Sequence, residues 1–355
     1  MNTVNVGIIG AGGIAQKLHL PQIAETSGLR VTHLSGRKES RLRTLAERFD
    51  VPHWTTDHHA MLADDSLEGI IVALPHPLHV PVGLEVLAAG KHLLMQKPLC
   101  GDMGEADQFV AAVEGSDRTV LVLPHFAPEI YRTRELVEEG AIGKPSGAHC
   151  RTSHGGPEVY YAEVLDGFGE KGGDLWFFDA QQASVGALFD MGVYAVASLV
   201  AAVGRVTSVM GETATLDKPT PLEDVATLIL RFENGAIGTA ETSWCDPART
   251  WQFRVHGTRG RIAVPGHEGA SMTRWEPGSY TREDIPPVPH AVDASSSARG
   301  NVHEHWLRCI SEGRQPERSH AWAARHVTEI LLAGLESSRT GQRVEIRSAA
   351  EPGGS

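Results

Sequence analysis

The chain has few cysteines, no long hydrophobic run and no room for a leader, and each shortage excludes a class of protein. Its 355 residues include only four cysteines, which lie far apart and form no C-x-x-C pair. This usage is typical of a reducing compartment and predicts neither a disulfide framework nor a zinc cluster. The longest apolar run, residues 195–203, is far shorter than the ~20 residues that a membrane-spanning helix needs. Met1-Asn2-Thr3 leads directly into an apolar segment, which leaves no space for a signal peptide, so we expect a cytoplasmic protein.

Positive charge is also scarce. The 32 Lys and Arg residues are outnumbered by 44 Asp and Glu residues, which gives a formal charge of −12. Because binding to a phosphate backbone requires clustered Lys and Arg, this balance argues against a nucleic-acid-binding protein. The length suits two domains of roughly 120–230 residues each. We expect these domains over residues 1–123 and 124–347, followed by a disordered tail over residues 348–355.

A glycine-rich motif stands near the start of the chain. Residues 4–9 are mostly apolar, as a strand buried on both faces requires, and residues 14–25 have a helical pattern. Between them lies Gly10-Ala11-Gly12-Gly13-Ile14-Ala15. In a strand–turn–helix unit, Gly10 makes the tight turn, Gly12 lets backbone amides approach a pyrophosphate, and the small Ala15 lets the helix pack on the strand. The motif predicts a dinucleotide site; the alternative is a glycine-rich turn of another α/β protein.

Strand and helix patterns alternate through the first 123 residues. The expected strands span residues 29–34, 69–74, 92–95 and 119–123, and helices are expected near residues 41–49, 80–89 and 103–114. This alternation predicts a doubly wound parallel sheet of the Rossmann type. Ligands of such sheets bind beyond the carboxyl ends of the strands, which draws attention to Leu74-Pro75-His76-Pro77 and to Met95-Gln96-Lys97-Pro98.

The end of the second expected strand bears on the choice of cofactor. An NAD-specific domain usually has an Asp or Glu here to bind the ribose 2′-hydroxyl, whereas this chain has Ser35-Gly36-Arg37-Lys38. A hydroxyl and two cations suit a 2′-phosphate, which an Arg can grip with two hydrogen bonds. We therefore expect NADP(H), with NAD(H) as the alternative if Arg37 and Lys38 are only a solvated helix start.

Several further motifs together resemble those of the Gfo/Idh/MocA family, which includes glucose–fructose oxidoreductase, inositol dehydrogenase and many sugar dehydrogenases. The resemblance covers nearly the whole chain. Besides the glycine loop, it rests on Ala73-Leu74-Pro75 with His79, Ala89-Gly90-Lys91-His92-Leu93-Leu94-Met95-Gln96-Lys97-Pro98-Leu99, Gly140-Ala141-Ile142-Gly143 and Gly186-Ala187-Leu188-Phe189-Asp190-Met191-Gly192-Val193-Tyr194. It implies that Lys97, Asp190 and residue 194 form the catalytic group. It also implies a C-terminal α+β domain with a large, mostly antiparallel sheet, helices on one face, and a homodimer or homotetramer formed through such sheets.

The chain departs from the family pattern at three places. Gln96 replaces the Glu of the Glu-Lys-Pro motif, Tyr194 replaces the His of Asp-x-x-x-His, and the glycine run before Asp190 is reduced to Ser184-Val185-Gly186. The lysine and aspartate match, whereas the third catalytic position does not. The resemblance therefore supports the fold more firmly than the proton-transfer step.

The residues support the second domain independently. Asn234-Gly235 is a strong hairpin signal between apolar-rich segments 226–232 and 236–244. Thr258-Arg259-Gly260 separates segments 252–256 and 261–264 in the same way. Residues 302–311 and 321–337 have helical patterns, and residues 343–346 form an expected closing strand. The fold expected is thus α/β in its N-terminal domain and α+β in its C-terminal domain.

The candidate catalytic residues have chemistry that suits a nicotinamide enzyme. The ammonium of Lys97 can bind the reacting oxygen, and desolvation would lower the pKa of this lysine, as would the absence of a carboxylate at Gln96. Asp190 and Tyr194 are four residues apart, which puts them on one face of a helix. Tyr194 could then exchange the substrate proton while Asp190 orients substrate hydroxyls. The alternatives are a packing role for Tyr194 and a surface carboxylate at Asp190.

Aromatic and histidine residues supply the candidate substrate contacts. Residues 153–179 are rich in glycine and contain Tyr160, Tyr161, Phe168, Trp176, Phe177 and Phe178. Trp176 could stack on a sugar ring, although a loop packed against a neighbouring subunit fits as well. His125, His149 and His154 could line the same cleft or be structural. His303-Glu304-His305 sets its histidines on different helix faces, so no metal site is expected.

These observations predict an NADP(H)-dependent oxidoreductase that acts on a secondary alcohol or ketone of a sugar, cyclitol or sugar derivative. Two other functions remain open: a catalytically silent dinucleotide-binding regulator, and a lyase or glycosidase that uses transient oxidation by its bound cofactor. The expected catalytic residues are Lys97, Asp190 and Tyr194, and the expected substrate contacts are Lys97, His125, His154, Trp176, Asp190 and Tyr194. The expected cofactor contacts are Gly10, Gly12, Gly13, Ile14, Ala15, Ser35, Arg37, Lys38, Leu74, Pro75, His79, Gln96 and Lys97.

Overall fold

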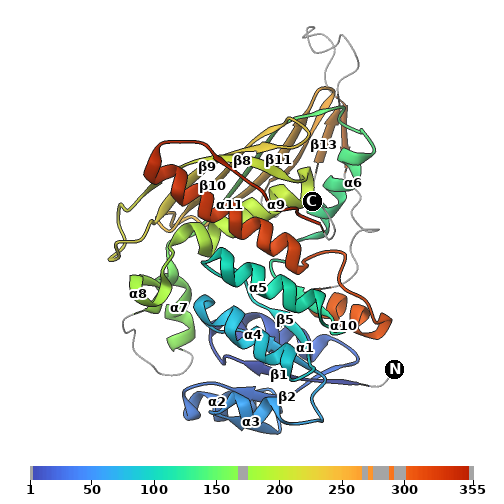
Figure 1. Ribbon diagram of the computed structural model, residues 1–355, viewed down its shortest axis with the longest axis vertical. Helices are drawn as coiled ribbons and strands as arrows, with labels where there is room; N and C mark the ends of the chain where they lie inside the picture. Colours follow the sequence, from blue (N-terminus) through green and yellow to red (C-terminus); the bar gives the residue numbers. More distant parts are fainter. Residues whose placement is uncertain (1–2, 167–174, 266–270, 275–287, 292–300, 352–355) are drawn as a thin grey trace. The chain divides into compact units, whose positions relative to one another are not determined.

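The computed structural model describes the chain except for residues 1–2, 167–174, 266–270, 275–287, 292–300 and 352–355 (Figure 1). The chain divides into two compact units. The first unit comprises Met1–His125, Glu158–Asp174 and Gly300–Arg325, and the second comprises Phe126–Pro157, Leu175–Arg299 and His326–Ser355. Both units are therefore discontinuous in sequence, unlike the two uninterrupted domains that we expected.

The first unit is built on a six-stranded parallel sheet with the order β3-β2-β1-β4-β5-β6. This is the strand order of a Rossmann domain, and it reverses between β1 and β4. The prediction of a doubly wound sheet is confirmed; the short β3 was not foreseen. The strands are β1 (Val4–Ile9), β2 (Leu29–Ser35), β3 (His53–Thr55), β4 (Gly69–Val72), β5 (His92–Met95) and β6 (Val120–Val122).

Capping side chains and a glycine with positive φ mark the ends of several helices in this unit. Asp102 accepts a hydrogen bond from the backbone N–H of Glu105 at the start of α5, and Asn301 forms a capping box with Glu304 at the start of α10. Gly313 ends α10 with a φ of 61°. The helices are η1 (Ala15–His19), α1 (Leu20–Glu25), α2 (Glu39–Arg48), α3 (His58–Leu62), η2 (His76–Leu78), α4 (His79–Ala88), α5 (Met103–Glu114), α7 (Pro157–Asp166) and α10 (Val302–Glu312).

Helix α10 belongs to the first unit although most of the second unit separates it from the Rossmann strands in sequence. The side chain of Trp306 is fully buried against β4. A Cβ atom on Gly69 would lie only 2.8 Å from the Trp306 ring, so the glycine makes room for the indole. Burying so large an aromatic surface stabilises this docking strongly. No short-range sequence pattern could show it.

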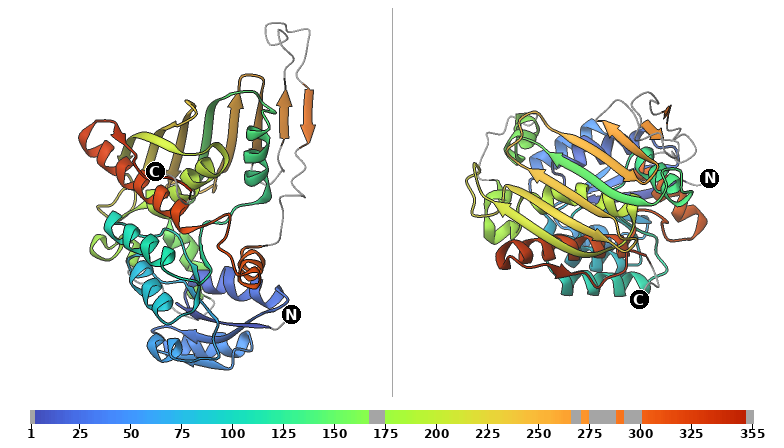
Figure 2. Two further views of the ribbon diagram at one scale, coloured as in Figure 1. Left: turned by 45° about the vertical axis from the view of Figure 1, so that its right-hand side comes forward. Right: turned by 90° about the horizontal axis from the view of Figure 1, so that it is seen from above.

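The second unit contains a nine-stranded sheet with the order β14-β13-β12-β11-β7-β10-β9-β8-β15 (Figure 2). Among the strands that the structure describes in this sheet, only the β7–β10 pair is parallel, so the predicted mostly antiparallel sheet is confirmed. The strands are β7 (Pro145–Ser153), β8 (Val206–Ala214), β9 (Val225–Phe232), β10 (Ile237–Ser243), β11 (Trp251–Gly257), β12 (Gly260–Pro265), β13 (Ser271–Arg274), β14 (Val288–Ala291) and β15 (Val344–Glu345).

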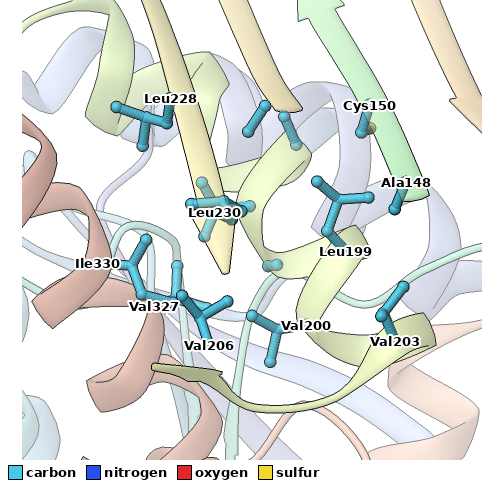
Figure 3. Packing of buried hydrophobic residues seen from close by; sticks show 14 of the residues in the cluster. Ala148, Cys150, Leu199, Val200, Val203, Val206, Leu228, Leu230, Val327 and Ile330 are labelled. Carbon is cyan, nitrogen blue, oxygen red and sulfur yellow. The ribbon is translucent and has the colours of Figure 1, made fainter. Parts of the chain in front are cut away.

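One face of this sheet forms the core of the second unit. Strand β9 alternates strictly, with Leu228 and Leu230 buried and Ile229 exposed. Figure 3 shows Leu199 and Val200 of α9 (Val193–Val203) in the same cluster of buried side chains as these leucines and Cys150 of β7. Helices α6 (Pro128–Glu138) and α11 (Ala321–Thr340) contribute further apolar side chains such as those of Ile130 and Ile330 to the same core (Figure 1).

The helical stretch Ala180–Val203 is long and apolar enough to cross a membrane by length and composition alone. It comprises α8 (Ala180–Ala183), η4 (Leu188–Gly192) and α9. In the structure, 78% of its apolar window is buried, mainly in the core of the second unit. Its hydrophobicity is therefore explained by packing against the sheet.

The chain after β15 is packed where we expected a disordered tail. Ser348 and Ala350 are buried, and the carboxylate of Glu329 accepts hydrogen bonds from the backbone N–H groups of Arg347 and Ser348. The expectation is wrong for residues 348–350 because a helix carboxylate satisfies their backbone donors. Residues 352–355 lie outside the described part of the chain.

Candidate active site

The glycine loop has the geometry that a pyrophosphate site requires. Gly10 has a φ of 107°, and a Cβ atom on it would lie 2.3 Å from the carbonyl oxygen of Ala73. Its backbone N–H donates to the carbonyl of Ser35 at 2.8 Å, which ties the loop to the end of β2. A Cβ atom on Gly12 would meet nothing within 4 Å. Gly10 is therefore required by the fold, whereas the space at Gly12 fits a ligand that approaches the backbone.

The helix after the loop begins differently from the expected continuous α-helix. Ile14 is the N-cap of η1, a five-residue π-helix that starts at the fully buried Ala15, and α1 follows it. Such π-turns often occur at functional sites. A Cβ atom on Gly13 would lie 3.1 Å from the ring of Tyr160 on α7, so this glycine permits α7 to pack beside the loop.

The predicted 2′-phosphate residues lie at the carboxyl end of β2. Ser35 is buried as the last residue of this strand, and Arg37 and Lys38 are exposed immediately before α2. The next carboxylate along the chain, Glu39, pairs with Arg43 at 3.1 Å on the helix surface. This arrangement of cations fits a 2′-phosphate.

His79 connects the ends of β4 and β5. Its Nδ1 lies 2.7 Å from the carbonyl oxygen of Pro98, and its Nε2 lies 2.8 Å from that of Leu74. Complete burial lowers the pKa of His79 to about 4, although the two carbonyl contacts act in the opposite direction because only the protonated ring can donate to both. The carbonyl of Pro75 accepts the backbone N–H of Leu78. His79 thus holds the strand ends rather than facing a ligand directly.

Gln96, which replaces the family glutamate, is 4% exposed and directed inward. Its Nε2 lies 2.9 Å from Nε2 of His19, and its Oε1 accepts the backbone N–H of Lys97 at 3.2 Å. Gln96 therefore acts within the protein interior. Lys97 follows directly after it, beyond the end of β5, and its side chain is partly exposed.

In the second unit, two residues from different parts of the chain, His154 and Trp244, meet at Asp190. Strands β7 and β10 are parallel and end in register, which brings the residues that follow them, His154 and Trp244, to the same edge of the sheet. The indole Nε1 of Trp244 donates to Oδ2 of Asp190 at 3.0 Å, and Nε2 of His154 lies 3.6 Å from the same oxygen. Nδ1 of His154 accepts the backbone N–H of Gly156, so its proton is on Nε2 and faces the carboxylate. His154 and Asp190 were expected at the substrate site; Trp244 was missed because it reads only as the end of an apolar strand.

The helix turn that carries Asp190 is held by Glu223. The Oε1 atom of Glu223 accepts the backbone N–H groups of Gly186 (2.9 Å) and Leu188 (3.2 Å) at the start of this turn. Burial raises the pKa of the Glu223 carboxyl, and these backbone hydrogen bonds oppose the shift. A Cβ atom on Gly186 would lie 2.2 Å from the Glu223 carbonyl oxygen, which explains why a glycine is kept where the family run is shortened.

The aromatic residues divide between the units. Trp176 and Phe177 belong to the short helix η3 (Trp176–Phe178) of the second unit, where their ring centroids are 3.9 Å apart. Phe177 and Phe178 both meet Trp244 edge to face, so this cluster packs against the residue that holds Asp190. Tyr160 and Tyr161 lie on α7 in the first unit, and Phe168 lies outside the described residues. Tyr194, near the start of α9, is partly buried against the core.

Two predicted histidines take other roles. His125 stacks on His305 of α10 at 5.2 Å in the first unit, and burial, helped by His305, lowers the pKa of His125 to about 3. His149 bonds Thr239 on the face of the sheet opposite the core. Neither is part of the Asp190 group, because strand alternation and the docking of α10 direct them elsewhere.

The His303-Glu304-His305 segment is engaged in protein contacts. His303 lies 2.9 Å from His19, and Nδ1 of His305 accepts a hydrogen bond from Arg308 at 2.7 Å. His305 also lies near Cys309 and Glu317 at distances that could hold a metal ion. The guanidinium on Nδ1 fixes the proton of a neutral His305 on Nε2, the nitrogen that faces Cys309, which opposes metal binding there.

Both units match known families. Residues 4–123 match the oxidoreductase family with an NAD-binding Rossmann fold, and residues 130–263 match the GFO/IDH/MocA C-terminal domain. The chain therefore belongs to the Gfo/Idh/MocA family and is a nicotinamide-dependent oxidoreductase.

Similar proteins include several named sugar dehydrogenases. The chain is 26% identical over 345 residues to D-xylose 1-dehydrogenase (NADP(+)) 2 of Haloferax volcanii, covering 96% of this chain and 99% of the relative. It is 24% identical over 355 residues to D-apiose dehydrogenase of Paraburkholderia graminis, covering 96% and 89%. The structure of levoglucosan dehydrogenase in complex with NADH and L-sorbose has a TM-score of 0.81 at 20% identity, covering 98% of this chain and 100% of that one, and this likeness shows the fold.

Proposed function

We propose that this protein is an NADP(H)-dependent dehydrogenase or reductase that acts on a secondary alcohol or ketone of a sugar, cyclitol or sugar derivative. The observation that carries the proposal is the Rossmann unit in which an open glycine loop and Lys97 both stand at carboxyl ends of parallel strands. The relatives named as D-xylose and D-apiose dehydrogenases support a sugar-like substrate.

The residues of the first unit fit the cofactor. Backbone amides at Gly12 and Gly13 would receive the pyrophosphate, and Ser35, Arg37 and Lys38 would bind a 2′-phosphate. The backbone hydrogen bond from Gly10 to the carbonyl of Ser35 joins the glycine loop to the end of β2, and it thereby holds the pyrophosphate-binding and 2′-phosphate-binding residues together. When bound, the nicotinamide accepts or donates the hydride.

Each unit supplies side chains for the remaining tasks, which are stabilising the reacting oxygen, binding the substrate and exchanging its hydroxyl proton. In the first unit, the Lys97 ammonium donates a hydrogen bond to the reacting oxygen and stabilises its developing negative charge. In the second unit, Asp190 accepts hydrogen bonds from substrate hydroxyls, while Trp244 and His154 orient its carboxylate. Tyr194 exchanges the hydroxyl proton in place of the family histidine.

The assembly proposed for this enzyme is a cytoplasmic homodimer or homotetramer that binds neither nucleic acid nor membrane. Its interface would be the face of the second unit's sheet opposite α9, defined by the exposed apolar residues Met210, Ile229 and Ile237. Met210 and Ile229 are cross-strand partners, so they form a continuous apolar area.

A fluorescence titration of the cofactor-free protein with NADPH and NADH, followed by turnover assays with pentoses, hexoses and cyclitols, tests the proposal. We expect tighter binding of NADPH and oxidation of at least one sugar with NADP⁺. Preference for NADH would overturn the cofactor assignment alone. Binding without turnover of any polyol or keto-sugar would favour the regulatory alternative, and release of a cleaved product without net NADPH formation would favour the transient-oxidation one.

A further inference from the structure

Four polar side chains, three of them buried, form a continuous hydrogen-bonded chain in the first unit. Gln96 contacts Nε2 of His19, Nδ1 of His19 lies 2.9 Å from Nε2 of His303, and Nδ1 of His303 lies 3.1 Å from Oε1 of Gln22. His19 and His303 are completely buried and Gln96 nearly so. The chain connects the end of β5, the helix after the glycine loop and α10, all within the first unit. We refer to it as the 96–19–303–22 chain.

The backbone N–H of Lys97 fixes the direction of this chain. It donates to Oε1 of Gln96, so the amide NH₂ of Gln96 must point to His19. Nε2 of His19 therefore accepts, which puts its proton on Nδ1, from which it donates to Nε2 of His303. His303 in turn carries its proton on Nδ1 and donates to Gln22. Each donor meets an acceptor only if both rings are neutral and share this tautomer.

We propose that Gln96 is a positioning residue for Lys97 through its Oε1 atom, and that the amide NH₂ of the same side chain imposes the neutral Nδ1–H tautomer on His19 and His303. A glutamate at this position could not do so. Both carboxylate oxygens only accept, so one would still take the Lys97 N–H while the other would require a proton on Nε2 of His19. The presence of Gln instead of Glu at position 96 therefore goes together with the Nδ1–H tautomers of the buried pair His19–His303.

The consequence for catalysis rests on the role of Lys97 in the proposed function. The chain joins the backbone of Lys97 to the helix after the glycine loop without adding a charge beside the lysine. Because the amide of Gln96 is uncharged, this connection holds the backbone of Lys97 at the strand end without placing a carboxylate from position 96 beside the ammonium that assists the reacting oxygen. The tautomers themselves do not depend on that role.

Nitrogen-15 NMR of the histidine rings in the cofactor-free protein tests the tautomers directly. In the unaltered protein, His19 and His303 should each show a protonated Nδ1 and an unprotonated Nε2 at neutral pH. In Gln96→Glu, Nε2 of His19 should become protonated, because an unpaired carboxylate would otherwise be buried. An unprotonated Nε2 in this variant, or the Nε2–H tautomer in the unaltered protein, would overturn the proposal.

A change at the other end of the chain is the matched control. Gln22→Leu removes the last acceptor but leaves Lys97 and Gln96 in contact, so the tautomer of His19 should stay unchanged. If the proton of His19 moves to Nε2 in this variant, the direction of hydrogen bonding along the 96–19–303–22 chain is set by Gln22, contrary to the proposal.

The catalytic link is tested by comparing Gln96→Leu with Gln96→Glu in folded enzyme. Gln96→Leu removes the acceptor for the Lys97 N–H and should lower kcat about tenfold, since one hydrogen bond is lost. Gln96→Glu keeps that acceptor and should retain more of kcat. If both variants melt at lower temperature but keep full kcat, the chain is only structural. That result would contradict the positioning role of Gln96 but not the proposed function. Conversely, absence of turnover in the unaltered protein would contradict the proposed function but would not affect the NMR result.

Discussion

Trp244 donates a hydrogen bond of 3.0 Å from its indole Nε1 to Oδ2 of Asp190. The indole is fully buried and is flanked edge to face by Phe177 and Phe178, so its donor position is fixed by packing. An indole N–H cannot accept or lose a proton in this role, which makes it a permanent orienting group for the carboxylate.

The first prediction concerns this pair. Trp244→Phe keeps an aromatic ring but removes the donor, and it should lower kcat/KM about tenfold or more because a hydrogen bond to a charged group is worth about 1.5–3 kcal/mol. Steady-state kinetics with the best sugar substrate measures the effect. Phe178→Leu perturbs the same cluster without touching Asp190 and should have a much smaller effect. Equal losses in the two variants would mean that packing, rather than the donor, matters.

The second prediction concerns Lys97. Lys97→Ala should lower kcat by at least about 100-fold in steady-state assays, since general acid–base or electrostatic assistance contributes this much. The control is the exposed Lys144, whose replacement by Ala should leave kcat unchanged. Full activity of Lys97→Ala would remove Lys97 from the mechanism.

The third prediction concerns the cofactor. Arg37→Ala should weaken NADPH binding roughly tenfold to a hundredfold, through loss of charge-assisted hydrogen bonds to the 2′-phosphate, and leave NADH binding unchanged. Arg43→Ala is the matched control, because this exposed arginine pairs with Glu39 one turn earlier on the same helix, α2. Parallel losses for NADPH and NADH would contradict a 2′-phosphate contact.

The fourth prediction concerns acid stability. Burial lowers the pKa of His303 to about 4 and that of His125 to about 3, from an ordinary value of 6.5. Below pH 6.5 the unfolded chain binds protons at these positions that the folded protein does not, so stability is full above pH 6.5 and falls as the pH drops toward 4. Each such group contributes a slope of up to about 1.4 kcal/mol per pH unit.

Urea unfolding at pH 7, 6 and 5 measures this slope. His125→Gln should flatten it, whereas replacing the exposed His59 by Asn should not. An unchanged slope in His125→Gln would mean that His125 is protonated in the folded protein.

The fifth prediction concerns assembly. Ile229→Glu puts a charge in the centre of the apolar area that includes its partner Met210, and it should shift the protein from an oligomer to a monomer in light scattering. Leu216→Glu, at another exposed apolar residue outside this sheet face, serves as the control. A monomeric unaltered protein would refute the proposed interface.

Local sequence determined much of the first unit. The Gly10–Ala15 loop between an apolar strand and a helix specifies one turn because only glycine tolerates the φ of Gly10 and its contact with Ala73. The alternation of apolar strands and helices then predicts a parallel sheet, and Met103–Glu114 and His92–Met95 have the bounds that their patterns indicate. In the second unit, Asn234-Gly235 likewise predicted the β9–β10 hairpin.

Only the tertiary structure decided which side chains meet. Trp244 reaches Asp190 because β10 packs against η4, and His303 reaches His19 because α10 docks on the first unit through Trp306. The sequence separations are 54 and 284 residues, so no periodicity or local motif carries these contacts. The sequence by itself therefore determined most elements of the Rossmann sheet and the dinucleotide type of the cofactor site, because their causes are steric and local. The partners of Asp190 and Gln96 depend on long-range packing, which brings distant polar groups together in the protein interior.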